Sequence, residues 1–171
     1  MSISVIDEEL IRRNGMVEMN DYLRALPSTN FIDQGPGRNN IIIRGVTTDA
    51  YWDDTVGIYI GDTPVSNLGR QGSGSPDLKL VDVARIEVLR GPQGTLYGEG
   101  SIGGTVRIIP AAPNPDRFEA QVTGSLSTTA GEGGNNNTAE GMVNLPMLDG
   151  VAALRLVAYR HDNSGYYRNV A

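Results

Sequence analysis

The sequence contains no cysteine, and there is one histidine, His161, among its 171 residues. Without cysteine, neither a disulfide framework nor a thiolate metal site can form. A metal site would have to be built from carboxylates, because one imidazole cannot supply a set of histidine ligands. The lack of cysteine is compatible with any cellular compartment and so locates nothing.

Basic residues are also scarce: 14 lysines and arginines stand against 20 aspartates and glutamates, which gives a net charge of −6. A nucleic-acid partner would require a basic face, so this balance argues against one. Lys79 is the only lysine, and all other cations are arginines. Because the guanidinium fork suits fixed pairs with carboxylates, we expect networked ion pairs.

Long apolar runs are absent as well. No stretch of about 18 apolar residues exists, so no transmembrane helix is expected, and a membrane role would have to come through strands. The opening residues MSISVIDEEL lack the basic start and apolar core of a signal peptide. There is no HExxH motif, and His161 has no evident serine partner. His161 stands beside Asp162 at a predicted strand end, where we expect surface exposure. We therefore expect neither an enzyme nor a cofactor.

Residues 1–28 predict one strand and two helices. The apolar run ISVI is typical of a strand, and Asp7 is the expected N-cap of the helix DEELIRRN, which Gly15 ends. A second helix runs up to Pro27. Its apolar stripe, which we expect to pack in a core, consists of Met19, Tyr22, Leu23 and Leu26.

Residues 29–110 are rich in strand signals without a regular βαβ period, which favours an α+β fold over a doubly wound sheet. The run IIIRG at 41–45 is continuous and apolar, as in a strand buried on both faces. Residues 77–84 read as a short helical or extended approach. Further strands are expected at 31–32, 56–65 with a turn at Gly61 and Asp62, 85–91 and 104–110.

A proline-rich linker at 111–117 precedes a third zone. FEAQVTGSLSTT alternates strictly, with Phe118, Ala120, Val122, Gly124 and Leu126 on one face. Residues 130–137 and 147–150 read as loops, and 138–146 and 151–163 as further strands. Such strands are typical of a transmembrane barrel, but an ordinary antiparallel sheet with one wet face has the same pattern.

The segment RIEVLRGPQGTLYGEGSIGGTVRIIP at 85–110 holds glycines 98, 100 and 103 at the spacing of a dinucleotide-binding loop. Such a loop needs a helix after its last glycine, whereas GTVRIIP is β-branched and predicts a strand. Without a helix N-terminus there is nothing to hold a pyrophosphate. We expect the glycines to serve tight turns and close backbone approaches instead.

The same segment resembles the signature of the plug domain of TonB-dependent outer-membrane receptors: an IERIEVLRGP strand, a Tyr-Gly turn, Gly-Gly and a VNIIT-like strand. Val83 and Ala84 replace the usual Ile-Glu, and VRIIP replaces VNIIT. Upstream, ISVIDEELIRRNG, MNDYLRALPS, NNIIIRGV and VGIYIGDTPVS also resemble plug segments, with Ser28 and Gly61 as departures. The resemblance covers residues 1–110 almost continuously, and the rest resembles the first barrel strands.

The resemblance implies an α+β plug domain, a small mixed sheet with short helices, in residues 1–112. Residues 118–171 would be the first antiparallel strands of an incomplete transmembrane barrel, which has about 22 strands when closed. Such receptors lie in the Gram-negative outer membrane, with the plug in the barrel lumen. They import a scarce ligand, such as a ferric siderophore, cobalamin, haem or a glycan, with energy from their partner TonB.

The resemblance also implies roles for particular residues. Arg44 and Arg90 match plug arginines that latch onto barrel glutamates; local pairing with Glu87 or Asp82 is the alternative. Both arginines end apolar strands, so we expect each to be half-buried. The expected ligand-binding residues in outward loops are Gln34, Arg38, Asn39, Arg70 and Gln71. The expected structural turn residues are Gly91, Pro92, Gly98, Gly103 and Gly104.

The sequence shows neither a signal peptide nor a segment for TonB contact, and too few strands to close a barrel. We expect a fragment of a receptor, which would meet TonB through a segment missing here. The alternative is a free-standing, soluble, plug-like ligand-binding module of the periplasm. The two hypotheses differ in whether the apolar face of 118–126 is exposed or covered.

Overall fold

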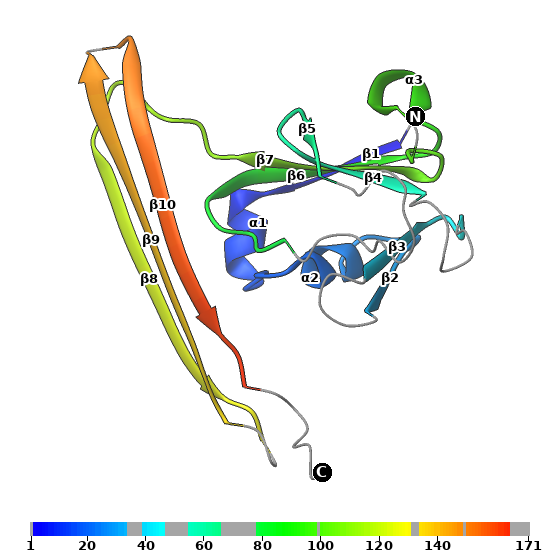
Figure 1. Ribbon diagram of the computed structural model, residues 1–171, viewed down its shortest axis with the longest axis horizontal. Coiled ribbons are helices and arrows are strands. Elements are labelled where there is room, and N and C mark those ends of the chain that lie inside the picture. Colours follow the sequence, from blue (N-terminus) through cyan, green and yellow to red (C-terminus); the bar gives the residue numbers. More distant parts are fainter. Residues whose placement is uncertain are drawn as a thin grey trace. The chain divides into compact units, whose positions relative to one another are not determined.

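A computed structural model describes residues 2–33, 39–46, 55–65, 78–98, 100–130, 134–148 and 150–164 (Figure 1). The chain divides into two compact units, Met1–Ala111 and Ala112–Ala171. None of the described helices has the length and hydropathy that a bilayer crossing requires.

The first unit is built on a five-stranded mixed sheet in the order β1-β6-β7-β4-β5. Neighbouring strands are antiparallel except for β4 and β7, which run parallel. This mixture, with few and short helices, confirms the predicted α+β class. The strands are β1 (Ser2–Asp7), β4 (Val56–Ile60), β5 (Thr63–Pro64), β6 (Val83–Arg90) and β7 (Gly104–Pro110).

Two helices and a hairpin complete the first unit and lie on one side of the sheet (Figure 1). They are α1 (Glu8–Arg13), α2 (Met19–Arg24), and the antiparallel pair β2 (Thr29–Asp33) and β3 (Asn39–Ile43). Asp7 caps α1 as predicted, since its Oδ1 accepts a hydrogen bond of 2.9 Å from the Leu10 N–H. Gly15 follows the helix at φ +60°, a conformation that suits glycine.

The core lies between the sheet and this layer. Met19, Tyr22 and Leu23 of the predicted α2 stripe are fully buried, and Leu26 packs against the core from its edge. Other buried core residues come from the strands of the sheet and of the hairpin. They include Ile6, Ile41, Ile43, Val56, Ile58, Ile86, Val88, Val106 and Ile108. The apolar stripe therefore forms the contact that its helical spacing predicts.

Two details of the first unit differ from the sequence prediction. Residues 41–45 are not buried on both faces: Ile41 and Ile43 are buried, but Ile42 between them is partly exposed. The reason is that β3 belongs to a two-stranded hairpin, which rests on the core with one face only. A one-turn helix, α3 (Gly94–Tyr97), also stands where only turns were expected.

The second unit is a three-stranded antiparallel sheet in the order β10-β9-β8. Its strands are β8 (Glu119–Thr128), β9 (Asn135–Leu148) and β10 (Ala152–Asp162). The loops predicted at 130–137 and 147–150 are therefore wrong in part. Asn135 pairs with Thr128 and Leu148 pairs with Ala152, so backbone pairing carries β9 beyond both expected ends.

His161 lies at the end of β10, within the strand predicted at 151–163, but it lacks the surface exposure that we expected at a strand end. Its side chain is only 7% exposed, and its Nε2 lies 3.3 Å from Glu140 Oε1. Thr138, the partner of His161 in the β9–β10 register, lies beside the ring. The exposure was wrongly predicted because side chains of the neighbouring strand β9 cover the ring, which a single strand does not reveal.

The buried hydroxyl of Tyr22 allows a test of how this core is packed. Burial raises the pKa of its hydroxyl, and that hydroxyl has no hydrogen-bond partner among the described residues. We expect Tyr22→Phe to raise the free energy of unfolding by about 1 kcal/mol, because phenylalanine fills the same space without an unpaired polar group. Urea unfolding followed by circular dichroism would measure this. Tyr22→Ala is the control and should lose roughly 3–5 kcal/mol, whereas a loss of stability in Tyr22→Phe would show that the hydroxyl is paired.

Candidate functional site

The candidate site is formed where the glycine-rich segment 91–104 connects β6 to β7. Backbone hydrogen bonds fold the segment onto itself: the Gly91 N–H donates to Gly103 O at 3.0 Å, and the Gln93 N–H donates to Ser101 O at 2.8 Å. The Gly103 N–H donates to Thr55 O at 2.8 Å and fixes the segment to the start of β4. The arrangement is a closed backbone turn between two strands.

The glycines of this segment meet two physical demands. Gly91 and Gly98 adopt φ values of +100° and +70°, which side chains disfavour. A Cβ on Gly104 would lie 2.4 Å from Leu89 O and 2.9 Å from the Ile43 side chain. Pro92 is exposed beside them. No helix follows Gly103, because β7 begins at Gly104, so the structure has no pyrophosphate-binding helix there.

Arg90 and Arg44, the two predicted latch residues, lie close together at one end of this segment. Arg90 ends β6, is half-buried, and donates from Nη2 to Ser4 Oγ at 2.6 Å. Arg44 follows β3, and its Nη1 would lie 3.9 Å from a Cβ on Gly91, the residue next to Arg90. The expectation of half-burial is wrong for Arg44, which is exposed because it stands in the turn beyond the hairpin strand.

Neither latch arginine forms an ion pair with a carboxylate in the part of the chain that the structure describes. Glu87, the proposed local partner, points to the other face of β6, where it pairs with Arg85 and with Arg107. Arg90 Nε is buried and has no hydrogen-bond partner among the described residues. Arg90 therefore keeps donor capacity for an acidic group.

The other face of the sheet carries an ion-pair network that the sequence reading missed. Arg107 of β7 donates from Nη1 to Glu87 at 2.9 Å and from Nη2 to Asp62 at 2.8 Å. Its guanidinium carbon lies 5.8 Å from the centre of the Tyr97 ring, and the Tyr59 hydroxyl donates to Tyr97 O at 2.5 Å. The network thus ties α3 and the β4–β5 turn to the two central strands.

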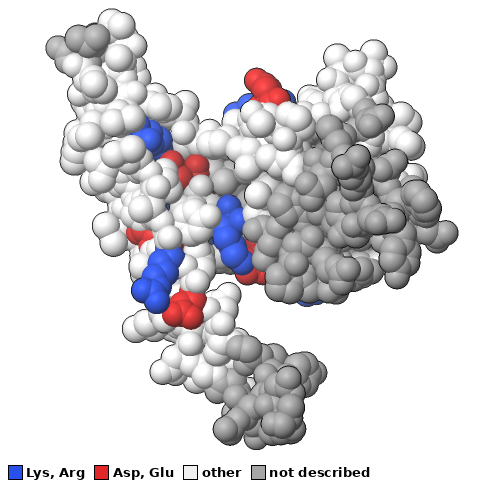
Figure 2. Space-filling view, in the orientation of Figure 1, with Lys and Arg blue, Asp and Glu red and all other residues white. Residues whose placement is uncertain are grey.

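Burial and the neighbouring acidic groups act in opposite directions on the pKa of Arg107. Partial burial lowers the pKa of the guanidinium, but the nearby Tyr97, Glu87 and Asp62 raise it above its ordinary value. Basic and acidic side chains also lie next to one another on the face drawn in Figure 2, where the blue and red groups occur on a mostly uncharged surface. The sequence did contain a signal for this network. Glu87 in RIEVLR and Arg107 in TVRII are charged residues of opposite sign within two apolar, alternating strands, so each points away from the core face of its strand.

Of the five predicted ligand-binding residues, only the backbone of Asn39 lies within the described part of the chain. Gln34, Arg38, Arg70 and Gln71 lie outside the described residues. Asn39 is the first residue of β3 and pairs with Asp33 across the hairpin, but its side chain is not among those described. Within the described ranges, no group of three or more His, Cys, Asp or Glu side chains could hold a metal ion.

The mixed sheet with its glycine-rich β6–β7 turn is the arrangement that the resemblance to a receptor plug predicts. The family model described as TonB-dependent Receptor Plug Domain matches residues 1–105. The chain belongs to this family, whose place is the outer membrane of Gram-negative bacteria.

Known relatives match beyond the plug. The chain is 30% identical over 167 residues to the iron-regulated outer membrane virulence protein of Vibrio cholerae, which covers 92% of this chain and 24% of the relative. It is 30% identical over 116 residues to the pesticin receptor of Yersinia pestis, covering 67% and 16% of the two chains. The chain therefore spans about a quarter or less of the length of these relatives.

Solved structures share the fold. The ferric yersiniabactin uptake receptor FyuA from Yersinia pestis matches with a TM-score of 0.77 and 24% identity, over 94% of this chain and 24% of that one. The siderophore receptor PirA from Pseudomonas aeruginosa matches with a TM-score of 0.67 and 28% identity, over 94% and 29%.

Gly104 offers a direct test of the turn. We expect Gly104→Ala to destabilise the first unit by more than about 2 kcal/mol, because the new methyl group would overlap a strand carbonyl and a core side chain. Gly94→Ala is the matched control, since a Cβ there meets nothing within 4 Å. Urea unfolding of both variants measures the difference, and equal stabilities would show that the β6–β7 turn has room for a side chain.

Proposed function

We propose that the chain supplies the plug, residues 1–112, and the first barrel strands, residues 118–171, of a longer receptor that imports a scarce ligand through the outer membrane. A ferric siderophore is the ligand class we favour, because the relatives named above include receptors for such iron complexes. TonB would supply the energy, and the barrel of the same receptor would surround the plug.

The observation that carries the proposal is the two-faced sheet of the second unit. Val122 and Leu126 are 88% and 89% exposed, and Leu154 and Leu156 of β10 are also exposed. The pairing register places these residues on one face and polar residues such as Gln121, Thr123, Glu140 and Arg155 on the other. An apolar face in contact with lipid and a polar face toward a lumen require this alternation.

Strand length supports the same proposal. β8, β9 and β10 contain 10, 14 and 11 residues, and a tilted strand needs about 9–11 residues to cross a bilayer. The alternative, a free-standing periplasmic module, would need the apolar face to be covered. Its exposure favours the receptor.

Hydrogen-bond donors of Arg90 and Arg44 support a latch between the plug and the barrel. Arg90 has a buried Nε without a partner among the described residues, and Arg44 stands exposed beside it. Barrel glutamates would complete both guanidinium forks and hold the plug in place. A pull at the N-terminus would reach β1, an edge strand of the described sheet that is held by its pairing with β6, so the force would act on a strand with one free edge.

The outward loops would meet the ligand. Gln34, Arg38, Asn39, Arg70 and Gln71 supply guanidinium and amide groups, which suit an anionic, oxygen-rich ligand. Substituting Arg38 or Arg70 by alanine would then weaken ligand binding without changing assembly of the receptor.

A charge placed on either face of β8 tests the membrane assignment. In a complete receptor carrying this chain, we expect Val122→Arg to impair barrel assembly, because an arginine facing lipid costs roughly 2–4 kcal/mol near the bilayer midplane. Thr123→Arg, one position along on the polar face, is the matched control and should assemble normally. Heat-modifiable migration of the membrane fraction reports assembly. A receptor that tolerates both changes would favour the soluble module.

Removing the latch arginines tests gating. We expect Arg90→Ala and Arg44→Ala to make the plug of the complete receptor more sensitive to protease and to lower the urea midpoint of plug release. The loss of one partner of a buried pair costs roughly 3–5 kcal/mol, and the exposed Arg44 should cost less. Arg85→Ala, on the same strand but facing the other side, is the control. Unchanged plug stability and ligand uptake in both latch variants would defeat the gating role.

A further inference from the structure

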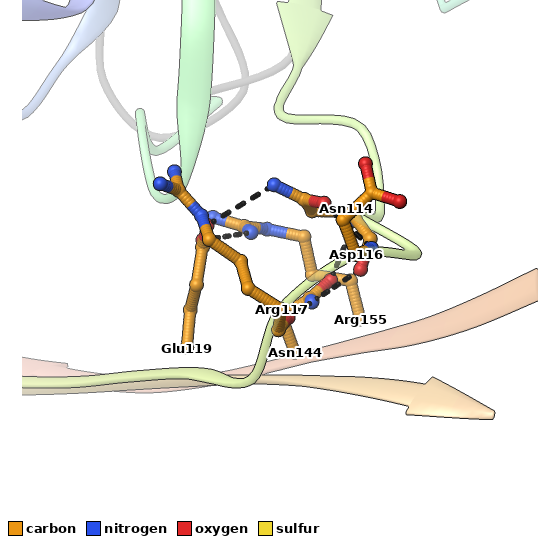
Figure 3. Close-up of polar contacts among 6 residues, drawn as sticks. All are labelled: Asn114, Asp116, Arg117, Glu119, Asn144 and Arg155. Carbon is orange, nitrogen blue, oxygen red and sulfur yellow. Dashed lines mark hydrogen bonds and ion pairs between the residues drawn. The ribbon is translucent and has the colours of Figure 1, made fainter. Parts of the chain in front are cut away.

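Asn144 of β9 is fully buried, and all of its side-chain hydrogen bonds go to the backbone of the linker that precedes β8 (Figure 3). Its Nδ2 donates to Asn114 O and to Arg117 O, both at 2.8 Å. Its Oδ1 accepts from the Asn114 N–H at 2.9 Å. One amide thus holds three backbone groups of residues 114–117 against the sheet.

A side-chain amide is the only group of this size that can make these bonds. The two amide hydrogens satisfy two carbonyl oxygens while the amide oxygen satisfies an N–H. A carboxylate would have no hydrogen to offer to Asn114 O and Arg117 O. An aliphatic side chain could make none of these bonds and would leave all three backbone groups without the partner that Asn144 supplies.

Neighbouring side chains brace the same turn. Asn144 stands opposite Glu119 of β8 and Arg155 of β10, so the three form one row across the sheet. Glu119 pairs with Arg117 of the linker and with Arg155. Asn114 Oδ1 accepts from the Asp116 N–H at 2.9 Å, which closes the turn internally (Figure 3).

The linker is therefore hydrogen-bonded to the first unit at one end and to the second unit at the other, and very few residues lie between the two attachments. The last backbone bond of the first unit joins the Ala111 N–H to Asp82 O at 2.9 Å. The next backbone bond along the chain is that of the Asn114 N–H to Asn144. Only Ala112 and Pro113 lie between these two attachments, and proline has no N–H to donate.

We propose that Asn144 is a positioning residue that sets the end of the movable part of the receptor. Residues 1–113 can leave with the plug, whereas residues 114–117 stay on the β8–β10 sheet. This inference rests on the proposed function, since it assumes a plug that moves relative to its barrel. It adds a fixed point from which the plug is tethered during uptake.

Hydrogen exchange tests the clamp in a complete receptor carrying this chain, in outer-membrane vesicles. In Asn144→Asp, we expect the amides of Asn114 and Asp116 to exchange roughly tenfold faster or more, because their hydrogen-bonded turn opens. Gln121→Glu is the matched control: it makes the same amide-to-carboxylate change on the same face of the sheet, and its side chain bonds only to Thr123. Equal exchange in the two variants would overturn the clamp. Asn144→Ser repeats the measurement should the aspartate variant fail to assemble.

Pulling the receptor from its N-terminus tests the boundary. In the parent receptor, the released chain should end at residue 113. In Asn144→Asp it should lengthen by about 17 Å, the extended length of residues 114–118. Equal released lengths would overturn the boundary role. Absence of any plug release in the parent would contradict the proposed function and the boundary together, whereas exchange at Asn114 reports on the clamp in either case.

Discussion

The pairing of β6 with β7 is the contact on which the first unit depends. These two strands lie between β1 on one side and β4 on the other, so every other strand of the sheet is held through them. Their approach is possible because Gly104 has no side chain where Leu89 O and Ile43 come close. The glycine-rich turn is thus a packing requirement of the core as well as a connection.

The alternation of β6 separates two kinds of charge. Glu87 faces the outer side of the sheet, where Arg107 and Asp62 complete a local network. Arg90 faces the side of Val88, where its Nη2 meets only the hydroxyl of Ser4. A one-residue change of register would exchange these roles. The strand therefore uses one set of charges for its own stability, and under the proposed latch Arg90 would pair with a group outside the plug.

The sequence was most informative where local rules act alone. The cap at Asp7, the stop at Gly15 and the buried stripe of α2 follow from spacing and side-chain chemistry, and all are present. The sequence was least informative where residues far apart in the chain determine the local structure. The asparagines at the start of β9 read as a loop, yet pairing with β8 makes them strand. Asn144 gave no signal, because its partners lie 27 and 30 residues away and are backbone groups.

In the proposed receptor, the second unit would anchor a domain that moves. Within a membrane, a sheet with one apolar face would gain its stability from lipid and from its neighbouring strands. The linker must then be fixed by polar groups on the opposite face, where water competes for every hydrogen bond. Full burial of Asn144 removes that competition, and the ion pairs of Glu119 cover the turn. A receptor that pulls its plug on each cycle needs such a point, because a strand edge without one would be peeled from the sheet along with the linker.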